Sequence, residues 1–504
     1  MINTLLVANR GEIALRVIRA ARELGIRTAA VFADDDAASL YVEEADAAYR
    51  LAGESPRETY LSPGAILDAA RRARADAIHP GYGFLSERGS FADAARNAGI
   101  VFVGPSVSAM NAVGSKTAAK AIAEKAGVPT IPWADASRLD DAGIARAARA
   151  IGFPLLIKAS AGGGGRGMRV VESERELSAA AAAARAEASA AFGDGAIFLE
   201  RFLSNPRHIE VQILGDDAGN VLHFFERECS IQRRHQKIVE ESPAPGIDDA
   251  LRSKLTSAAI AIARATAYTN AGTVEFLVEP DGAFYFIEVN ARLQVEHPVT
   301  EAVTGIDLVA WQLRIASGER LTMRQEAIFA RGHAIECRVT AEDSRQGFLP
   351  AAGVLARADF PRGAGVRIDS GVRAGDLITP RYDSLLAKII VHAETRDAAA
   401  RRMERALAET ILLGIPTNID FLSALVRDDD FRRGRTSIEF LASRTERLCA
   451  DAPISKRDAI AIALFEAMRG SLASSLAGGG SRNGGAESGA NDPWDLVRDF
   501  RCNR

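Results

Sequence analysis

The sequence has few cysteines and no long apolar run. Its 504 residues include four widely spaced cysteines, none of them in a CxxC pair: Cys229, Cys337, Cys449 and Cys502. This spacing argues against both a disulfide framework and a zinc site. No run of 18 apolar residues occurs, and Arg10 and Glu12 interrupt the first apolar stretch, so we expect neither a signal peptide nor a membrane span. A cytoplasmic protein is therefore predicted.

The chain also lacks an excess of charge of either sign. Its net charge is −4, which implies no bulk attraction to nucleic acid or to an anionic membrane. The basic run RRHQK at 233–237 is followed by Glu240 and Glu241, so a local role is expected for it. With 47% hydrophobic residues the chain can fill the cores of about three domains.

Alternating apolar runs and helical patterns organise the first 100 residues, which predicts βαβ units and a parallel sheet. A helix is predicted over 113–126. We divide the chain into an α/β domain, a mixed domain with a compact insert, a β-rich domain and a tail: 1–113, 114–330 with its insert at about 133–203, 331–446 and 447–504. Within the tail, the Gly/Ser-rich segment 471–491 is predicted to be a disordered linker.

A β-hairpin is predicted over residues 273–289. Two apolar-rich runs at 273–279 and 283–289 are separated by a Pro-Asp-Gly turn. If Asp and Gly form a two-residue loop, Glu275 lies directly opposite Glu288. Their Cβ atoms would then be about 4.5 to 5.5 Å apart, a separation at which like charges destabilise the pair.

A cation between the two glutamates would remove this repulsion. Asn290 shares their face, and oxygen ligands suit Mg²⁺ or Mn²⁺, so a metal site is predicted at Glu275, Glu288 and Asn290. The alternative is an exposed hairpin with both glutamates in solvent. The opposite face is predicted to pack on a core through Val274, Phe276, Val278, Tyr285, Ile287 and Val289.

The polar pattern continues after the hairpin. Along an extended chain Arg292 and Gln294 point to the same side as Glu288. Pro298 follows Glu296 and His297, and the restriction that proline places on the preceding residue predicts no regular helix at that point.

A glycine loop, SAGGGGRGM at 160–168, formally contains GxGxxG, but a strand rather than a helix is predicted after it. The loop is therefore either a flap whose bare N–H groups can bind phosphate or a flexible turn. Lys158 before it supplies a charge that favours the flap, and Lys116 is a second lysine at a helix start. The histidines show no zinc spacing, and HPGYGFLSE at 79–87 is either a ligand-binding loop or a simple one.

These motifs together resemble a known family. The motifs KASAGGGGRGM, NPRHIEVQ, RRHQK, FIEVN, RLQVEHPVTE and AIECRV closely resemble the biotin carboxylase component of biotin-dependent carboxylases, from Ile2 to about residue 446. The resemblance implies an ATP-grasp fold with an N-terminal parallel-sheet α/β domain, a lid at about 133–203 and a C-terminal β-rich domain. It also implies that ATP and bicarbonate form carboxyphosphate, whose carboxyl group passes to N1′ of biotin.

The same resemblance implies the site residues. Glu296 would be the base that deprotonates bicarbonate, and Arg338 would stabilise the biotin enolate, with Tyr82 also among the residues that bind bicarbonate or biotin. Bicarbonate would be bound by Lys237, Arg292, Gln294 and Val295. ATP and its two Mg²⁺ or Mn²⁺ ions would be bound by Lys116, Lys158, Gly164, Gly165, Arg166, Gly167, Glu200, Arg201, Leu203, His208, Gln232, His235, Glu275 and Glu288. Position 201 is arginine where relatives often carry lysine.

The tail resembles the segment that follows this region in α-subunits of acyl-CoA carboxylases. It contains no AMKM, so biotin is expected as a substrate on a carrier protein and not as a group attached to this chain. A biotin carboxyl carrier and a carboxyltransferase subunit are the expected partners, and Arg19 and Glu23 lie where relatives often form a homodimer. Two alternatives are another ATP-grasp ligase and a catalytically inactive nucleotide-binding subunit.

Overall fold

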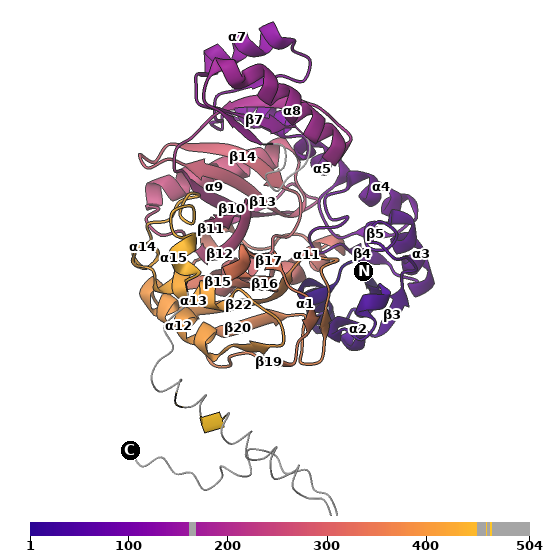
Figure 1. Ribbon diagram of the computed structural model, residues 1–504. Coiled ribbons are helices and arrows are strands. Elements are labelled where there is room, and N and C mark those ends of the chain that lie inside the picture. The colour runs from indigo at the N-terminus through magenta and orange to yellow at the C-terminus, as the bar shows by residue number, and fades with distance from the viewer. Residues whose placement is uncertain (161–167, 451–459, 461–463, 466–504) are drawn as a thin grey trace, which may run out of the picture. The chain divides into compact units, whose positions relative to one another are not determined.

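A five-stranded parallel sheet begins the chain in the computed structural model, which describes residues 1–160, 168–450, 460 and 464–465 (Figure 1). The strand order is β3-β2-β1-β4-β5. The elements are β1 (Thr4–Val7), α1 (Gly11–Glu23), β2 (Arg27–Phe32), η1 (Asp34–Asp36), α2 (Leu40–Glu44), β3 (Ala47–Arg50), α3 (Pro63–Ala73), β4 (Ala77–His79), α4 (Gly89–Asn97) and β5 (Val101–Phe102). Leu5 and Leu6 of β1 are buried in different apolar clusters, because both faces of a parallel sheet are covered. The predicted βαβ units are confirmed.

Two helices, α5 (Val107–Gly114) and α6 (Lys116–Lys125), replace the single helix predicted over 113–126. The break is at Ser115, whose side chain accepts a hydrogen bond from the Ala118 backbone N–H and caps α6. Lys116 is consequently the first residue of a helix.

A four-stranded antiparallel sheet with order β6-β9-β7-β8 follows. The elements are β6 (Trp133–Asp135), α7 (Asp141–Ile151), β7 (Leu155–Ala159), β8 (Arg169–Val171), α8 (Glu174–Phe192) and β9 (Ile197–Arg201). Leu155, Ile157 and Leu199 share a buried cluster with apolar residues of α7 and α8. Lys158 and Glu200, which alternate with these residues, therefore lie on the other face of the sheet.

An eight-stranded antiparallel sheet with order β14-β13-β10-β11-β12-β15-β22-β20 carries the predicted hairpin at one edge. Its strands are β10 (Arg207–Gly215), β11 (Val221–Arg233), β12 (Gln236–Ser242), β13 (Asn270–Val278), β14 (Phe284–Asn290), β15 (His333–Thr340), β20 (Val366–Ser370) and β22 (Leu385–Ala393). Because β12 pairs with β15, the predicted boundary near residue 330 falls between strands of one sheet.

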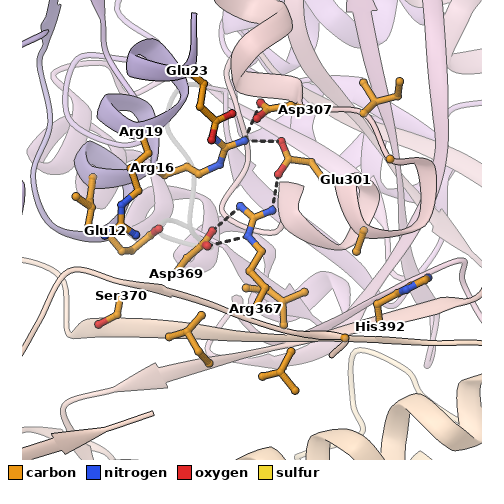
Figure 2. A pocket seen from close by; sticks show the side chains of 18 residues that line it. Glu12, Arg16, Arg19, Glu23, Glu301, Asp307, Arg367, Asp369, Ser370 and His392 are labelled. Atoms are coloured by element: carbon orange, nitrogen blue, oxygen red, sulfur yellow. Dashed lines mark hydrogen bonds and ion pairs between the residues drawn. The ribbon is translucent and has the colours of Figure 1, made fainter. Parts of the chain in front are cut away.

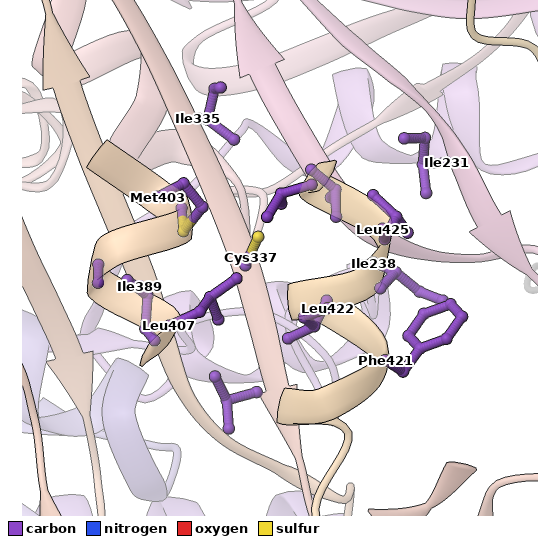
Figure 3. Packing of buried hydrophobic residues seen from close by; sticks show 14 of the residues in the cluster. Ile231, Ile238, Ile335, Cys337, Ile389, Met403, Leu407, Phe421, Leu422 and Leu425 are labelled. Carbon is purple, nitrogen blue, oxygen red and sulfur yellow. The ribbon is translucent and has the colours of Figure 1, made fainter. Parts of the chain in front are cut away.

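The remaining elements surround this sheet. They are α9 (Asp249–Ala265), α10 (His297–Thr304), α11 (Leu308–Ala316), η2 (Gln325–Ala327), β16 (Glu342–Asp343), η3 (Ser344–Gln346), β17 (Leu349–Pro350), β18 (Gly353–Val354), β19 (Arg357–Asp359), β21 (Leu377–Ile378), α12 (Arg396–Glu409), β23 (Ile411–Leu413), α13 (Ile419–Arg427), α14 (Asp429–Arg432) and α15 (Thr445–Leu448). Helices α12 and α13 pack Met403, Leu407 and Leu422 against Cys337 and Ile389 of the sheet (Figure 3).

The hairpin prediction was correct for its key pair and wrong in its turn. Glu275 pairs with Glu288, as predicted. However, the Glu279 N–H donates to the Ala283 carbonyl, so the loop has three residues and not two. The register shift that restores the pairing makes Ile287 the extra residue of a β-bulge.

The bulge also changes which side chains reach the core. Tyr285 and Ile287, predicted on the core face, are half-buried and lie outside the buried cluster. Phe286 joins that cluster in their place, and the half-buried Phe284 packs against it. A one-residue shift moves alternate side chains to the opposite face of a strand. The other four predicted core residues, Val274, Phe276, Val278 and Val289, are buried there.

A helix does begin just before Pro298, contrary to our prediction. Helix α10 starts at His297, and Pro298 lies in its first turn, where a backbone N–H has no intrahelical partner to lose. Glu296 is therefore fixed at the N-cap of a helix.

The chain divides near its C-terminal end. Residues 1–449 form one unit and residues 450–504 a second. The predicted linker at 471–491 lies outside the described residues. Within the described part of the chain, no helix has the length and apolarity needed to cross a bilayer.

Candidate active site

A row of charged residues crosses four neighbouring strands of the eight-stranded sheet. Arg227 of β11 pairs with Glu210 of β10, Glu210 pairs with Glu275 of β13, and Glu275 pairs with Glu288 of β14. Directly opposed side chains point to the same face, so three carboxylates lie side by side. Such a row requires cations, and the surrounding residues supply them.

Arg227 anchors one end of the row. Its guanidinium is fully buried and donates to Glu210 at 2.5 Å, to Gln212 at 2.8 Å and to Thr300 and Thr273 at 3.0 and 3.1 Å. Burial opposes the charged form of this guanidinium, but Glu210 outweighs it and raises the pKa of Arg227. The arginine therefore stays charged inside the protein and fixes Glu210.

Lys237 of β12 holds three carboxylates at once. Its Nζ lies 2.5 Å from Glu210, 2.9 Å from Glu275 and 2.6 Å from Glu296. Burial disfavours the ammonium, yet these carboxylates raise the pKa of Lys237 well above its usual value. The side chain joins the row on the sheet to Glu296 at the start of α10.

Glu275, in the middle of the row, has four close polar partners in addition to its strand neighbours. Lys237 and His208 Nε2 lie 2.9 and 3.0 Å away, and the Asn290 and Gln294 side-chain amides donate at 2.8 and 3.2 Å. Burial opposes ionisation of Glu275, but Lys237 and His208 outweigh it and hold the pKa of Glu275 well below its usual value. Glu275 is therefore ionised at neutral pH.

The oxygen atoms that the hairpin offers as ligands suit a hard divalent cation. Glu288, opposite Glu275, is half-buried, and its Oε2 lies 3.1 Å from Lys116 Nζ. Glu288 raises the pKa of Lys116, even though burial opposes its charge. Two carboxylates and the Asn290 amide oxygen are ligands that Mg²⁺ or Mn²⁺ would accept.

Two other groups of residues could also offer ligand atoms to a metal ion. Within each group, the ligand atoms lie within 4.8 Å of one another. Lys237 contacts two carboxylates in each group, so their charge is already compensated. These groups are His208, Glu210 and Glu275, and Glu210, Cys229 and Glu296.

Glu296 is fully buried between two cations. Its Oε1 lies 2.6 Å from Lys237 and its Oε2 accepts from Arg338 at 2.9 Å. Burial and the nearby Glu210 raise the pKa of Glu296, but Lys237 and Arg338 outweigh them and the net effect lowers it. A carboxylate that stays unprotonated at neutral pH can accept a proton.

Arg338 of β15 donates hydrogen bonds to two carboxylates. Its Nε donates to Glu240 at 2.6 Å while its terminal nitrogen donates to Glu296. Glu240 is fully buried, and this burial raises its pKa to about 7 despite the opposing charge of Arg338. The guanidinium is consequently held in one orientation.

Arg292 and Gln294 extend the polar face of the hairpin, as predicted. Arg292 donates to the side-chain oxygens of Asn290 and Gln294 at 3.1 and 2.9 Å and lies 3.0 Å from Glu87. The Val295 carbonyl accepts from Lys388 at 3.0 Å. The segment that follows the hairpin is thus held from several elements.

Tyr82 lies in a loop that is organised by His79. The Gly81 N–H donates to His79 Nδ1 at 3.0 Å, and the Tyr82 hydroxyl donates to Glu12. Lys388 lies 3.2 Å from Glu12 and 5.9 Å from the centre of the Tyr82 ring. Since Lys388 also holds Val295, it connects this loop to the segment containing Glu296.

Several predicted nucleotide-binding residues come together near α6. Lys158 is paired with Glu200, and the Lys116 N–H donates to the Ser160 carbonyl at 3.2 Å. Burial and the charges of Lys158 and Lys116 lower the pKa of His235, which places that imidazole in the same electrostatic environment.

Other predicted nucleotide residues lie along the strands. The Arg201 guanidinium donates to the Tyr285 hydroxyl at 3.2 Å, Leu203 is buried, and Gln232 donates to His208 Nδ1 at 2.5 Å. Burial disfavours protonated His208, but Glu275 outweighs it and raises the pKa of His208. The predicted flap residues Gly164, Gly165, Arg166 and Gly167 lie outside the described residues.

Several charged residues that contact the predicted site residues were not predicted from the sequence, among them Lys120, Glu210, Arg227 and Lys388. Two of them had a visible signal: Lys120 lies one helical turn after Lys116, and Glu210 alternates with His208 in NPRHIEVQ. Arg227 and Lys388 had none, because their partners are brought close only by the pairing of strands distant in sequence.

Comparisons with known proteins agree across the chain. The family models for "Biotin carboxylase, N-terminal domain", "Carbamoyl-phosphate synthase L chain, ATP binding domain" and "Biotin carboxylase C-terminal domain" match residues 1–110, 115–324 and 336–443. The chain is 47% identical to the biotin carboxylase of Pseudomonas aeruginosa over 445 residues, which cover 88% of this chain and 99% of that protein. It is 44% identical to the methylcrotonoyl-CoA carboxylase subunit alpha of Dictyostelium discoideum over 504 residues, which cover 100% of this chain and 71% of that protein.

A solved structure is also similar. The biotin carboxylase domain dimer of the Hydrogenobacter thermophilus 2-oxoglutarate carboxylase, in complex with MgADP, ADP and bicarbonate, has a TM-score of 0.87 and 45% identity. The match covers 90% of this chain and 99% of that chain.

Proposed function

Since this chain belongs to the biotin carboxylase family, we propose that it catalyses the ATP-dependent carboxylation of biotin by bicarbonate. The observation that carries the proposal is the position of Glu296, a fully buried carboxylate between Lys237 and Arg338. Such a group can take the proton of bicarbonate while the two cations hold the anion that results.

Bicarbonate would bind beside Glu296. Arg292 and Gln294 already point along the same face as Asn290, and Lys237 reaches Glu296 from β12. Bicarbonate is a poor nucleophile, so the transfer of the γ-phosphoryl group of ATP to it depends on positioning and on neutralised charge. Deprotonation by Glu296 would let bicarbonate attack the γ-phosphorus with ADP as the leaving group. The carboxyphosphate that results would break down to phosphate and the carbon dioxide that is transferred to biotin.

ATP would bind with its phosphates near α6. Lys116 at the helix start and Lys158 at the end of β7 supply the cations, and the carboxylates that hold them in this structure would be exchanged for phosphate. Glu275, Glu288 and Asn290 would hold the Mg²⁺ or Mn²⁺ ions, which neutralise phosphate charge when bound. The adenosine end would lie along Glu200, Arg201, Leu203 and His208, with Gln232 and His235 beside it.

Biotin would approach from the side of Arg338 and Tyr82. Transfer of the proton of its ureido nitrogen to the phosphate released from carboxyphosphate would leave negative charge on the ureido oxygen, and the fixed Arg338 guanidinium would stabilise that charge. The biotin would be borne by a carrier protein or domain, and a carboxyltransferase subunit would use the product. The named relatives differ in their final acceptor, so we assign the half-reaction and no acceptor.

We also propose that two copies associate through a surface that includes Arg19 and Glu23. A cavity of about 590 Å³ lies beside these residues (Figure 2). Within it Arg16 and Arg367 hold Glu301 at 3.0 and 2.7 Å, which connects α1, α10 and β20 along the cavity. A concentration-independent monomer in light scattering would contradict the homodimer.

Two other functions fit the chain less well. A carbamoyl-phosphate-type ligase would account for the model matched at 115–324 but not for the two biotin carboxylase models on either side of it. A catalytically inactive nucleotide-binding subunit would not require Glu296 and Arg338 to form a complete ionised pair. We propose the cytoplasm as the compartment, which suits the free cysteines Cys229 and Cys337.

The test is an assay of bicarbonate-dependent ATP cleavage by the purified chain, with and without free biotin. Stimulation by biotin is expected. ATP cleavage that requires bicarbonate but is indifferent to biotin would favour another ligase, and ATP binding without cleavage would favour an inactive subunit.

A further inference from the structure

Lys120 and Lys158 share one buried carboxylate. Lys120 Nζ lies 2.5 Å from Glu200 Oε1, and Lys158 Nζ is paired with Glu200 Oε2. The two lysines reach Glu200 from different elements, since Lys120 is on α6 and Lys158 is on β7. Glu200 therefore has one cation on each of its oxygens.

The side chains of Glu200, Lys120 and Lys158 are all largely shielded from solvent. Glu200 and Lys120 have side-chain exposures of 1%, and that of Lys158 is 11%. A charged group at such depth is stable when an opposite charge accompanies it, and removal of the partner is strongly destabilising. Glu200 thus requires a cation in every state of the protein, and Lys158 is the more exposed of its two lysine partners.

Helix α6 lies between the two sheets that carry the acidic partners of its lysines. Leu156 pairs with Glu200 in the β7–β9 register, so Lys158 and Glu200 lie on the same face of that sheet. Lys120 lies one turn after Lys116 on α6, and Lys116 binds Glu288 on the large sheet. One face of α6 therefore presents a lysine to each of the two sheets.

Combining these facts with the proposed function, on which this inference rests, we infer that Lys120 is a positioning residue that lets Lys158 change partner. When ATP is bound, Lys158 leaves Glu200 for a phosphate oxygen, and Lys120 remains to compensate the buried carboxylate. Without Lys120, the departure of Lys158 would leave Glu200 buried and unpaired, so Lys158 would stay on Glu200 and phosphate binding would weaken.

The experiment compares Lys120→Met with Lys125→Met, an exposed lysine of the same helix, by calorimetric titration with a non-hydrolysable ATP analogue and with adenosine. Loss of one partner of a buried charge pair is strongly destabilising, so the Kd of the analogue should rise at least about tenfold in Lys120→Met and stay unchanged in Lys125→Met. The Kd of adenosine, which has no phosphate, should change less than about threefold, because Lys158 then stays on Glu200 and keeps the carboxylate beside the adenosine end compensated.

Glu200→Gln provides the second arm, because it removes the charge that Lys120 compensates. In the Glu200→Gln background, Lys120→Met should weaken binding of the analogue by less than about threefold, since no buried carboxylate then holds Lys158. Equal loss in both backgrounds, or equal loss for adenosine and the analogue, would overturn the inference. Thermal melts of each variant check folding. Wild-type binding of the analogue without biotin-stimulated turnover would contradict the proposed function and leave this comparison valid.

Discussion

Lys237 Nζ lies 2.6 Å from Glu296 Oε1, which ties the proposed base to the row of carboxylates on the large sheet. The same ammonium contacts Glu210 and Glu275, so a single positive charge is shared by three carboxylates. Arg227 and Arg338 supply the remaining compensation from either side. The charge state of Glu296 is therefore set by strands β10, β11, β12, β13 and β15 together.

Lys237→Met should destabilise the protein. Three buried carboxylates would lose their shared partner, and breaking a buried charge pair costs about 3 to 5 kcal/mol. Urea unfolding at pH 7 measures the free energy of unfolding, with the exposed Lys254→Met as a control. An unchanged free energy of unfolding in Lys237→Met would show that Lys237 does not compensate the row.

Glu288→Gln should raise the metal concentration needed for activity. It removes one of two directly opposed carboxylates, and the half-saturating Mg²⁺ concentration is expected to rise by about 10- to 100-fold. Asp281→Asn removes a charge from the exposed loop of the same hairpin and should leave this concentration unchanged. Unchanged metal dependence in Glu288→Gln would contradict a cation between Glu275 and Glu288.

Arg338→Lys should separate the biotin-dependent step from ATP cleavage. Lysine cannot donate to Glu240 and Glu296 with the fixed fork that Arg338 uses. Biotin-stimulated turnover should fall by about 10²-fold, in line with the loss of one preorganised donor, while biotin-independent ATP cleavage falls less. Assays with and without biotin measure both rates, and an equal fall in the two would refute a role of Arg338 at biotin.

Stability should fall on acidification because of His79. Burial lowers the pKa of His79 from 6.5 to about 4, and protonation of Nδ1 would break the hydrogen bond from the Gly81 N–H. The unfolded chain therefore binds this proton first, so the stabilisation present above pH 6.5 is lost as the pH falls towards 4. The expected loss is at most about 3 kcal/mol.

The variant His79→Asn tests this pH effect. Asparagine can keep an acceptor near the Gly81 N–H but does not titrate in this range. Urea unfolding at pH 7.0, 5.5 and 4.0 should show a smaller acid loss in the variant than in the wild type. Parallel losses in the two proteins would contradict the assignment to His79.

Local patterns in the sequence predicted much of this fold. The βαβ alternation and the hairpin depend on residues close in sequence, and both were confirmed. The predicted loop of the hairpin was one residue too short. The bulge at Ile287, which compensates for the longer loop, has no distinct local signal in the sequence. The helix at His297 was missed because proline restricts the preceding residue in general but is accepted in the first turn of a helix.

The site was predictable in part for the same reason. Glu275, Glu288 and Asn290 could be placed on one face by counting along a single hairpin. Lys237 and Arg338 were assigned from the family resemblance, and the structure places each of them against Glu296. Their neighbours Arg227 and Lys388 depend on pairing between distant strands, which no spacing in the sequence encodes.

The most direct test of the account is the rate of bicarbonate- and biotin-dependent ATP cleavage by Glu296→Gln, measured beside its affinity for an ATP analogue. Glutamine keeps the size of the side chain but cannot accept the proton, so turnover should fall by about 10²- to 10⁴-fold while affinity for the analogue is retained. Turnover within a few-fold of the wild-type value would contradict the assignment of Glu296 as the base.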